Sequence, residues 1–436
     1  MKTFLAIGLM CISAPRALSA YEYHLTDLGL PPGFVLAKAS AINNQQQIVG
    51  RVEDAKQLTH AFIWENGSMR LLDMPENSLS VASDINEFGE IVGTMLSNGQ
   101  RHAFISRNDA PLRIGLIDEF PHLGGKHNFV PGVSIDNQSR VAFRIYADDE
   151  HQGSVLWNER TPIHFGLLAA GATCHASTIN NQGHIGGQLF QRDGRSSAFL
   201  WHDGIITDLG TLGGTRAGIT GLNDMGVAIG WSTINANDLS QAHAFIQIDG
   251  EMHDLGTLHG EHTRAYDINN ANQIVGFSKN AQKRWSAFVW ENYELTDLNS
   301  EIDPSLGYRL ISSNGINDRG DIIAVSIRDN ESRACLLSPK QPNAISSKQG
   351  SIHSDSENDV STITPRLTRF EHSTANDAFR IEFQGSPDGV YLIEASTDLI
   401  NWRPIGTANN NQGHLSLIDP VPGATQLRFY RAIQTD

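Results

Sequence analysis

Cysteine is rare in this chain, with 3 residues among 436. Cys11 falls in an N-terminal segment that has the features of a signal peptide, which leaves Cys174 and Cys335 in the remainder. An export compartment permits disulfides. The internal repeat described below, however, separates these two residues by three units, farther than a disulfide can reach. We therefore expect two free thiols.

Positive charge is also in short supply. The chain has 32 Lys and Arg residues against 48 Asp and Glu, a formal net charge of −16. A surface of this sign repels phosphate backbones and anionic lipid headgroups. We therefore expect no nucleic-acid partner.

Long hydrophobic runs are absent beyond the N-terminus. Residues 1–20 combine Lys2, an apolar stretch and a small-residue ending at Ala17-Leu-Ser-Ala20, and this combination predicts a signal peptide. No lipobox surrounds Cys11, and no other run approaches the length of a membrane span. The sequence thus predicts a secreted or cell-surface protein with no membrane span, with the periplasm as an alternative location.

The common catalytic motifs are missing as well. The chain contains no Gly-x-Ser-x-Gly elbow, no His-Glu-x-x-His pair and no EF-hand loop. Its carboxylates are scattered, and none form a pair that the sequence alone identifies as general acid and base. We therefore assign no catalytic residue and expect neither a cofactor nor a metal.

What the chain does contain is a repeat. An apolar residue followed by Asn or Asp recurs at spacings of 43, 50, 44, 43, 46 and 48 residues; these anchors are Ile42, Ile85, Ile135, Ile179, Leu222, Ile268 and Ile316. Seven units of this length are typical of four-stranded propeller blades.

The units share an internal pattern. Four residues after the anchor comes a glycine such as Gly226, replaced in three units by Gln46, Ser139 and Asn272, which predicts a hairpin turn with a left-handed position. Eight residues after the anchor comes a second glycine such as Gly230, replaced in two units by Phe143 and Ala324. It marks a close backbone approach, expected here where neighbouring blades crowd one another. A short aromatic strand and a final strand complete the unit.

The last unit lacks its final strand. A strand of the missing type, Tyr23-His-Leu-Thr-Asp-Leu-Gly29, stands alone before the first unit. We infer that this N-terminal strand completes the last blade and so closes the ring, which removes the exposed edges of an open array. The sequence therefore predicts an all-β fold with a seven-bladed β-propeller over residues 21–338.

The composite pattern resembles a known family. Asp208-Leu-Gly-Thr-Leu-Gly-Gly214, Asp267-Ile-Asn-Asn270 with Ile274-Val-Gly276, and His60-Ala-Phe-Ile-Trp64 are similar to the HAF-repeat family of probable extracellular bacterial repeat proteins, over roughly residues 22–338. The third unit departs from the pattern and the seventh is degenerate. The resemblance implies a secreted protein of β architecture and no known reaction.

The C-terminal part differs in composition. Residues 339–364 are polar and rich in serine, which predicts a flexible linker. Residues 365–436 contain alternating strands separated by turns, which predicts a small β-sandwich. Glu394-Ala-Ser-Thr-Asp-Leu399, Asn401-Trp402 and Arg428-Phe-Tyr-Arg431 resemble a fibronectin-like module of secreted bacterial proteins, which implies an accessory or surface-presenting role.

Two recurring side chains are interpreted as structural. The histidines of the His-Ala-Phe strands, His60, His102 and His243, stand too far apart to share a metal, so we expect hydrogen bonds within each blade. The tryptophans at one register position, Trp64, Trp157, Trp201 and Trp290, are expected to pack between blades and not to stack on sugars.

The candidate site lies in the connectors that enter each innermost strand, since these line one mouth of a propeller channel. They carry eight basic residues: Lys38, Lys126, His127, His175, Arg216, His259, Arg264 and Arg309. On an acidic protein such a ring attracts an anionic ligand, although the same residues are also typical of ordinary solvated loops.

The leading hypothesis is a non-enzymatic module, which we expect to be a monomer, that binds an extracellular glycan or protein. A polysaccharide-active lyase or hydrolase at the channel, and a structural adhesion component, remain alternatives. An enzyme would bring titratable residues with perturbed pKa values together near the axis, and a structural protein would have a plugged channel.

Overall fold

A computed structural model of the protein describes residues 22–340, apart from 98–99, 109, 115–127, 147–151, 159–161, 166–171, 237, 249 and 292, together with the backbone of strands between residues 366 and 435. The predicted signal peptide, and the predicted linker beyond residue 340, lie outside the described residues. Within the described part, no helix has the length and hydrophobicity needed to span a membrane. The chain divides into two compact units, one over Ala20–Asn343 and one containing Ala344–Asp436.

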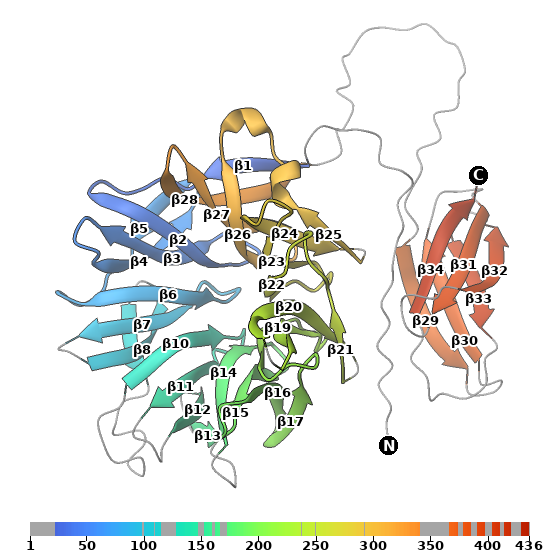
Figure 1. Cartoon of the computed structure of the whole chain (residues 1–436), viewed down its shortest axis with the longest axis horizontal. Helices are drawn as coiled ribbons and strands as arrows, with labels where there is room; N and C mark the ends of the chain where they lie inside the picture. Colours follow the sequence, from blue (N-terminus) through green and yellow to red (C-terminus); the bar gives the residue numbers. More distant parts are fainter. Residues whose placement is uncertain are drawn as a thin grey trace, which may run out of the picture. The chain divides into compact units, whose positions relative to one another are not determined.

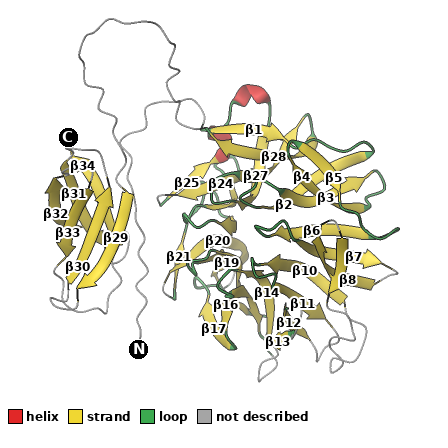
Figure 2. Cartoon of the chain, turned by 180° about the vertical axis from the view of Figure 1, so that it is seen from behind, coloured by secondary structure: helices red, strands yellow, loops and turns green. Residues whose placement is uncertain are grey.

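The first unit is a seven-bladed β-propeller, as predicted (Figure 1). Each blade is a four-stranded antiparallel sheet whose innermost strand ends at one of the seven anchor residues. Among the described residues of this unit, regular structure other than strand is limited to short 3-10 turns, which lie beside β1 in Figure 2.

The first four blades follow the chain in order. Blade 1 consists of β2 (Phe34–Ile42), β3 (Ile48–Asp54), β4 (Thr59–Glu65) and β5 (Ser68–Leu71). Blade 2 consists of β6 (Leu79–Ile85), β7 (Ile91–Ser97), β8 (Gln100–Arg107) and β9 (Ala110–Ile114). Blade 3 consists of β10 (Asn128–Ile135), β11 (Val141–Tyr146), β12 (Gln152–Trp157) and β13 (Ile163–Phe165). Blade 4 consists of β14 (Thr173–Ile179), β15 (Ile185–Phe190), β16 (Ser196–His202) and β17 (Ile205–Gly210).

The remaining blades complete the circle. Blade 5 consists of β18 (Ala217–Leu222), β19 (Ala228–Asn235), β20 (Asp238–Ile248) and β21 (Glu251–Asp254). Blade 6 consists of β22 (Thr263–Ile268), β23 (Ile274–Lys279), β24 (Trp285–Glu291) and β25 (Glu294–Asp297). Two 3-10 turns, η4 (Leu298–Ser300) and η5 (Pro304–Leu306), lead into blade 7, whose strands are β26 (Arg309–Ile316), β27 (Ile322–Arg328), β28 (Glu331–Pro339) and the N-terminal β1 (Tyr23–Asp27).

The pairing of β1 with β28 closes the ring, as the sequence predicted. The strands run antiparallel from Tyr23 opposite Pro339 to Asp27 opposite Cys335. Tyr308 donates a hydrogen bond from its Oη to Asp27 Oδ2 at 2.9 Å, and the amide of Leu28 donates to the carbonyl of Ala334 at 3.0 Å. The first and last strands of the propeller therefore share one sheet.

Each blade has a β-bulge at a common place on its innermost strand. The register shifts between Ala39 and Ala41 in β2, and six other innermost strands have a shift in the same region. In six blades the bulged residue stands two before the anchor; these residues are Ser40, Ser83, Ser177, Thr220, Tyr266 and Asn314. A bulge re-aims the side chain at that position, and five of these six residues line one channel cavity.

The bulge also explains the glycine that stands eight residues after the anchor in five of the seven blades. A Cβ built on Gly230 would lie 2.0 Å from the carbonyl oxygen of Gly218, on the neighbouring strand of the same blade. Gly276 meets the carbonyl of Arg264 at the same distance. The expected crowding is therefore real, but its assignment to contact between blades was wrong: the innermost strand of the same blade excludes the side chain.

The hairpin turns after the anchors are as predicted. Asn43 Oδ1 accepts hydrogen bonds from the amides of Gln45 and Gln47 at 3.1 and 2.9 Å. The fourth residue after the anchor has a positive φ in all seven blades; these residues are Gln46, Gly89, Ser139, Gly183, Gly226, Asn272 and Gly320. Asparagine at the start of the turn, or Asp136 in blade 3, therefore holds the left-handed geometry even where glycine is replaced.

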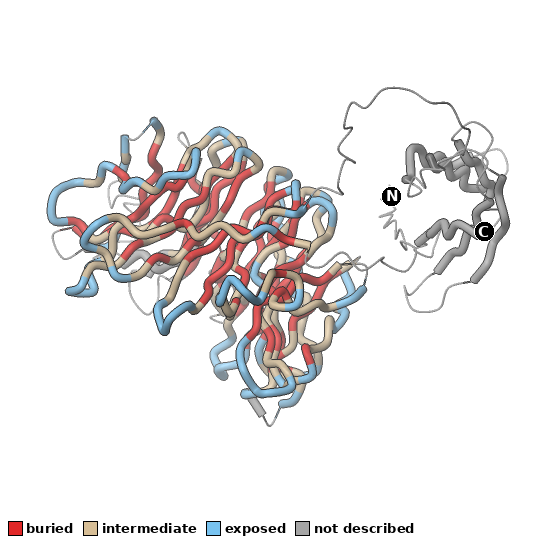
Figure 3. The backbone as a smooth tube through the Cα atoms, turned by 90° about the horizontal axis from the view of Figure 1, so that it is seen from above, coloured by how far each residue is buried: buried red, intermediate tan, exposed pale blue. Residues whose placement is uncertain are grey.

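Apolar side chains between neighbouring blades form the core. Figure 3 shows the buried residues along the strands of the propeller. Trp64 of blade 1 packs with Ile323 and Leu336 of blade 7, and the other three recurring tryptophans occupy equivalent places between blades. Their predicted role in packing between blades is confirmed. Cys174 and Cys335 are buried free thiols on blades 4 and 7, as expected.

The second unit contains six strands in two three-stranded antiparallel sheets. One sheet has the order β29 (Arg366–Ser373), β30 (Ala378–Gln384), β33 (His414–Asp419). The other has the order β32 (Arg403–Asn409), β31 (Val390–Ser396), β34 (Phe429–Thr435). The unit is all-β, and the β-sandwich and fibronectin-like assignments stay predictions.

Candidate functional site: the two ends of the propeller channel

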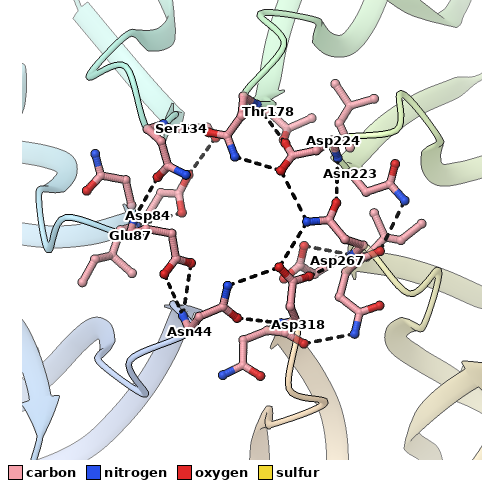
Figure 4. A pocket seen from close by; sticks show the side chains of 18 of the residues that line it. Asn44, Asp84, Glu87, Ser134, Thr178, Asn223, Asp224, Asp267 and Asp318 are labelled. Atoms are coloured by element: carbon pink, nitrogen blue, oxygen red, sulfur yellow. Dashed lines mark hydrogen bonds between the residues drawn. The ribbon is translucent and has the colours of Figure 1, made fainter. Parts of the chain in front are cut away.

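Hydrogen bonds join all seven blades at one end of the channel, which we call the turn side because the turns after the anchors form it (Figure 4). The residue two after each anchor donates its backbone N–H to the side-chain oxygen of its equivalent on the next blade, at 2.8–3.1 Å. The members of this ring are Asn44, Glu87, Asn137, Asn181, Asp224, Asn270 and Asp318. The ring closes from Asp318 back to Asn44, so no blade is left out.

A second set of bonds lies beneath the first. The asparagine directly after the anchor donates its side-chain N–H to a backbone carbonyl of the next blade, at 2.8–3.3 Å, in six of the seven blades. Blade 3 has Asp136 at this position, which cannot donate. There Arg140 binds Asp136 at 2.5 Å and reaches the carbonyl of Asn181 on blade 4 at 3.4 Å.

The cavity on the turn side has a volume of about 260 Å³ and is acidic. Its lining includes five carboxylates and, among the described residues, no Lys, Arg or His; the carboxylates are Asp84, Glu87, Asp224, Asp267 and Asp318. Desolvation raises the pKa of Asp84 and raises that of Asp267 to about 7, and for Asp267 the nearby charges of Asp84 and Asp318 act in the same direction.

The two deeper carboxylates also have structural partners. Asp84 Oδ2 accepts from the amide of Ile135 at 3.0 Å and from the hydroxyl of Ser134 at 2.7 Å, both on blade 3. Asp267 Oδ2 accepts from the amide of Ile316 on blade 7 at 2.9 Å. These contacts use the carboxylates to connect adjacent blades, and the described residues contain no group of three side chains arranged to hold a metal.

The opposite end of the channel, where the innermost strands begin, has the other charge; we call it the connector side. Its cavity of about 380 Å³ is lined by Lys38, Ala39, Ser40, Arg51, Ser177, Thr220, Tyr266 and Asn314. Two of these are cations and none of the described lining residues is a carboxylate. The channel is therefore basic at one end and acidic at the other.

Lys38 and Arg51 face each other across paired strands of blade 1. Like charges directly opposite one another destabilise a sheet. Arg51 is partly neutralised by Glu53, whose Oε1 lies 3.2 Å from Arg51 Nε, whereas Lys38 forms no ion pair with the described residues. Lys38 therefore leaves a positive charge on the connector side that no carboxylate of the described residues neutralises.

The predicted site residues are distributed unevenly. Lys38 lines the connector-side cavity. Arg264 is not among its lining residues, and its guanidinium lies 4.4 Å from the ring centroid of Trp231 on blade 5. Arg309 donates to the carbonyl of Trp285 at 3.4 Å, while Arg216 and His259 are exposed in the connectors. Lys126 and His127 lie outside the described residues.

His175 has a different environment. Its ring is 6% exposed and packs against Phe190, with ring centroids 4.4 Å apart. Burial, and to a lesser extent Arg144, lowers the pKa of His175 to about 4. At neutral pH the ring carries no charge, so His175 adds no positive charge to the connector side.

Sequence reasoning overlooked several lining residues. Arg51 lies on the second strand of its blade, and Tyr266 and the hydroxyl and amide groups occupy the bulged positions. The residue two before the anchor is polar or aromatic in six of the seven units, and this recurrence was visible in the sequence. Alternation alone would not have revealed which way it points, because the bulge changes that direction.

The histidines of the His-Ala-Phe strands lie within their own blades. His243 Nδ1 is 2.7 Å from Asp254 Oδ2, and both residues belong to blade 5. His60 packs on the ring of Phe34 in blade 1, with ring centroids 5.6 Å apart. The expected hydrogen bond within a blade is confirmed for His243.

Comparison with known proteins finds similar solved structures but no family. No protein-family model and no curated protein sequence matches the chain, so the HAF-repeat resemblance stays a prediction. Similar solved structures include the β-propeller domain of the Trilobed protease from Pyrococcus furiosus, at 8% identity over 70% of this chain and 95% of that one, with a TM-score of 0.46.

Two further structures are similar at the same level. YCF48 bound to D1 peptide is 9% identical over 74% of this chain and 99% of that one, with a TM-score of 0.43. TolB from Acinetobacter baumannii is 10% identical over 70% and 80%, with a TM-score of 0.35. At these identities the likeness concerns the propeller fold alone, which the strand pairing above establishes independently.

Proposed function

We propose that this protein is an extracellular binding module that takes an anionic glycan at the connector side of its propeller channel. The signal-like segment 1–20 supports an extracellular location. The observation that carries the proposal is Lys38, a cation without an ion-pair partner among the described residues, opposite Arg51 in a cavity with no carboxylate in its described lining.

The electrostatics favour a ligand of negative charge. The protein as a whole has a formal net charge of −16. A local excess of positive charge in one cavity therefore distinguishes that cavity from the rest of the acidic protein. Screening limits the range of the overall field to about 8 Å at physiological salt. Within the channel the local cations therefore dominate, and binding should weaken as ionic strength rises.

The remaining lining groups favour a sugar. Ser40, Ser177, Thr220 and Asn314 offer hydroxyl and amide groups that both donate and accept hydrogen bonds. Tyr266 adds an aromatic surface. A few polar groups around an aromatic side chain are the usual composition of a pocket that orients a small polar ligand.

A second candidate is a polysaccharide-active hydrolase or lyase on the turn side. It is favoured by the pKa of Asp267, which is raised to about 7, since a carboxyl that stays protonated near neutral pH can act as a general acid. Burial raises the pKa of Asp84 in the same cavity as well. Both carboxylates, however, already accept hydrogen bonds from neighbouring blades. Binding on the connector side therefore has the stronger support.

Isothermal titration with oligogalacturonates tests the proposal. We expect Lys38→Ala to weaken binding by about tenfold, because one charge-assisted contact is lost, and we expect affinity to fall with added salt. Lys56→Ala is the matched control, since Lys56 is exposed in a turn of the same blade.

The other arms separate the alternatives. An acidic peptide bound in preference to the oligogalacturonate would make the ligand a protein. Release of reducing sugar or unsaturated product would support the enzyme. Equal affinity of the Lys38→Ala variant and the natural protein would overturn the proposed site, and absence of every response would favour a structural role.

A further inference from the structure

Blade 6 carries a cluster of aromatic rings that begins at the connector-side cavity. Tyr266 lines that cavity, and its ring centroid lies 5.3 Å from that of Phe277. Phe277 contacts Trp285 at 5.0 Å, and His262 lies 6.0 Å from Phe277 and 5.3 Å from Trp285. These four rings form one continuous group, which we call the aromatic platform.

The platform is open to solvent at both ends. Tyr266 is 38% exposed and Trp285 is 41% exposed. An exposed tryptophan and tyrosine joined by further rings is unusual on a soluble surface, where large apolar side chains are normally scattered singly. The platform therefore extends from the channel over blade 6 as a surface with one aromatic group at each end.

Cations accompany the rings. Lys279 Nζ lies 5.0 Å from the ring centroid of Trp285, and Arg309 donates to the Trp285 carbonyl at 3.4 Å. Arg264 stands two residues before Tyr266, and burial lowers its pKa. Its Nε is buried and has no hydrogen-bond partner among the described residues.

The fold does not require these rings. At the positions of Tyr266, Phe277 and Trp285, blade 1 has Ser40, Arg51 and Thr59. The same three positions in blade 2 are Ser83, Thr94 and Arg101, and in blade 4 they are Ser177, Gln188 and Ser196. These blades fold with polar residues there, so packing does not explain why blade 6 has three aromatic ones.

We propose that the aromatic platform binds sugar rings of an acidic polysaccharide chain whose neighbouring residue occupies the connector-side cavity. This inference rests on the proposed function and extends it from a single acidic sugar to a polymer. The apolar C–H faces of pyranose rings pack against the exposed aromatic rings, which combine apolar area with a small entropy cost. Lys279 and Arg309, which lie at Trp285, then meet carboxylates along the chain.

Chain length is the decisive variable in the test. Oligogalacturonates of two to eight residues are titrated into the full-length protein, with neutral xylohexaose as the uncharged control. Affinity of the natural protein should rise with length until the platform is covered. Trp285→Ala should remove that gain, with about a tenfold loss for the longer chains and little change for the dimer.

Two variants make the result specific. Tyr293→Ala is the matched control, because Tyr293 is also 41% exposed on blade 6 but lies in the turn between β24 and β25, at the opposite end of these strands from Trp285. It should leave affinity unchanged. Trp285→Phe keeps a ring and should restore most of the length dependence that Trp285→Ala loses. Circular dichroism confirms that each variant is folded.

The outcomes distinguish the platform from the cavity. Length-dependent binding that depends on Lys38 but not on Trp285 would overturn the platform and leave the proposed function in place. No binding of any oligogalacturonate by the natural protein would overturn both. Binding of xylohexaose with equal affinity would contradict the acidic polymer and replace it with a neutral one.

Discussion

The glycine on the second strand of a blade is required because a carbonyl oxygen of the innermost strand leaves no room for a Cβ atom. Gly230 lies opposite the bulged part of β18, where the carbonyl of Gly218 points at the place that a Cβ would occupy. The same contact recurs in four other blades, at Gly50, Gly93, Gly187 and Gly276. Blade 3 has Phe143 and blade 7 has Ala324 at this position. The innermost strand of blade 3 has a different register shift, between Val130 and Ser134, whereas that of blade 7 has the usual shift, between Ser313 and Gly315.

We predict that Gly230→Ala destabilises the propeller. The added Cβ would lie 2.0 Å from a backbone oxygen, so the strands must move apart, at a cost of about 3 kcal/mol. Thermal denaturation should show a fall in Tm of several degrees.

Gly218→Ala is the control on the partner strand. A Cβ there meets its nearest atom, Gln188 Cβ, at 3.5 Å, which is an ordinary contact. If the two variants melt at the same temperature, steric exclusion within the blade is not the reason for glycine at position 230.

The sequence foresaw these glycines only in part. A recurring glycine shows that a side chain is excluded, but the pattern does not show which atoms exclude it. The same limit applies to His175 and Lys38, which share one offset from the anchor. Lys38 lines a cavity, whereas His175 packs on Phe190. The difference arises from the neighbouring side chains, which no offset along the chain encodes.

Among the strands, β1 has the most distant partner. It is separated from β28 by the whole propeller, yet its side chains belong to two interfaces: Tyr23 packs with the core between blades 6 and 7, and Leu28 directly after it packs with the core between blades 7 and 1. The closure was predictable because the last unit lacked one strand type and the N-terminus supplied it. The repeat pattern alone was therefore enough to predict that β1 completes blade 7.

We predict that deletion of residues 21–29 greatly lowers stability. The deletion exposes the edge of β28 and removes Tyr23, Leu25 and Leu28 from the core, each worth about 2 kcal/mol. Thermal and urea denaturation measure the loss. Since the deleted chain can fail to fold, Leu28→Ala provides a milder test, with an expected loss of about 2–4 kcal/mol. An unchanged Tm for both would contradict closure by β1.

The molecule as a whole has a channel with opposite charges at its two ends. The sequence pointed to the basic end through its connector residues, but not to the acidic end. Asp84 and Asp267 stand directly before their anchors in different units, and the scattered order of carboxylates along the chain conceals that the ring brings them to one cavity. Asp84 and Asp267 come close together only because the seven units close around one axis.

This arrangement predicts a pH dependence of global stability. The folded-state pKa of Asp267 is about 7, above the ordinary value of 3.8. Between these values the folded protein holds a proton that the unfolded chain releases, so the free energy of unfolding falls as pH rises through this window and levels off above it. Relative to Asp267→Asn, the natural protein should lose roughly 1–3 kcal/mol between pH 5 and pH 8.

The difference between the two proteins is the informative quantity. The pKa of His175 is lowered to about 4, so its titration raises stability with pH below about 6.5 and opposes the aspartate in the natural curve. Denaturation of both proteins at several pH values cancels this common contribution. Parallel curves would show that Asp267 does not titrate in this range.

Ring closure by β1 also sets an order of events for a chain made from its N-terminus. The first strand of the propeller to leave the ribosome pairs with residues 335–339, which are among the last of the propeller to be made. Until residues 335–339 are made, β1 has no strand to pair with and blade 7 lacks its outer strand. A chain that ends before β28 can stack blades in turn, but it cannot join them into a ring. Synthesis of β28 is therefore the step that allows the ring to close.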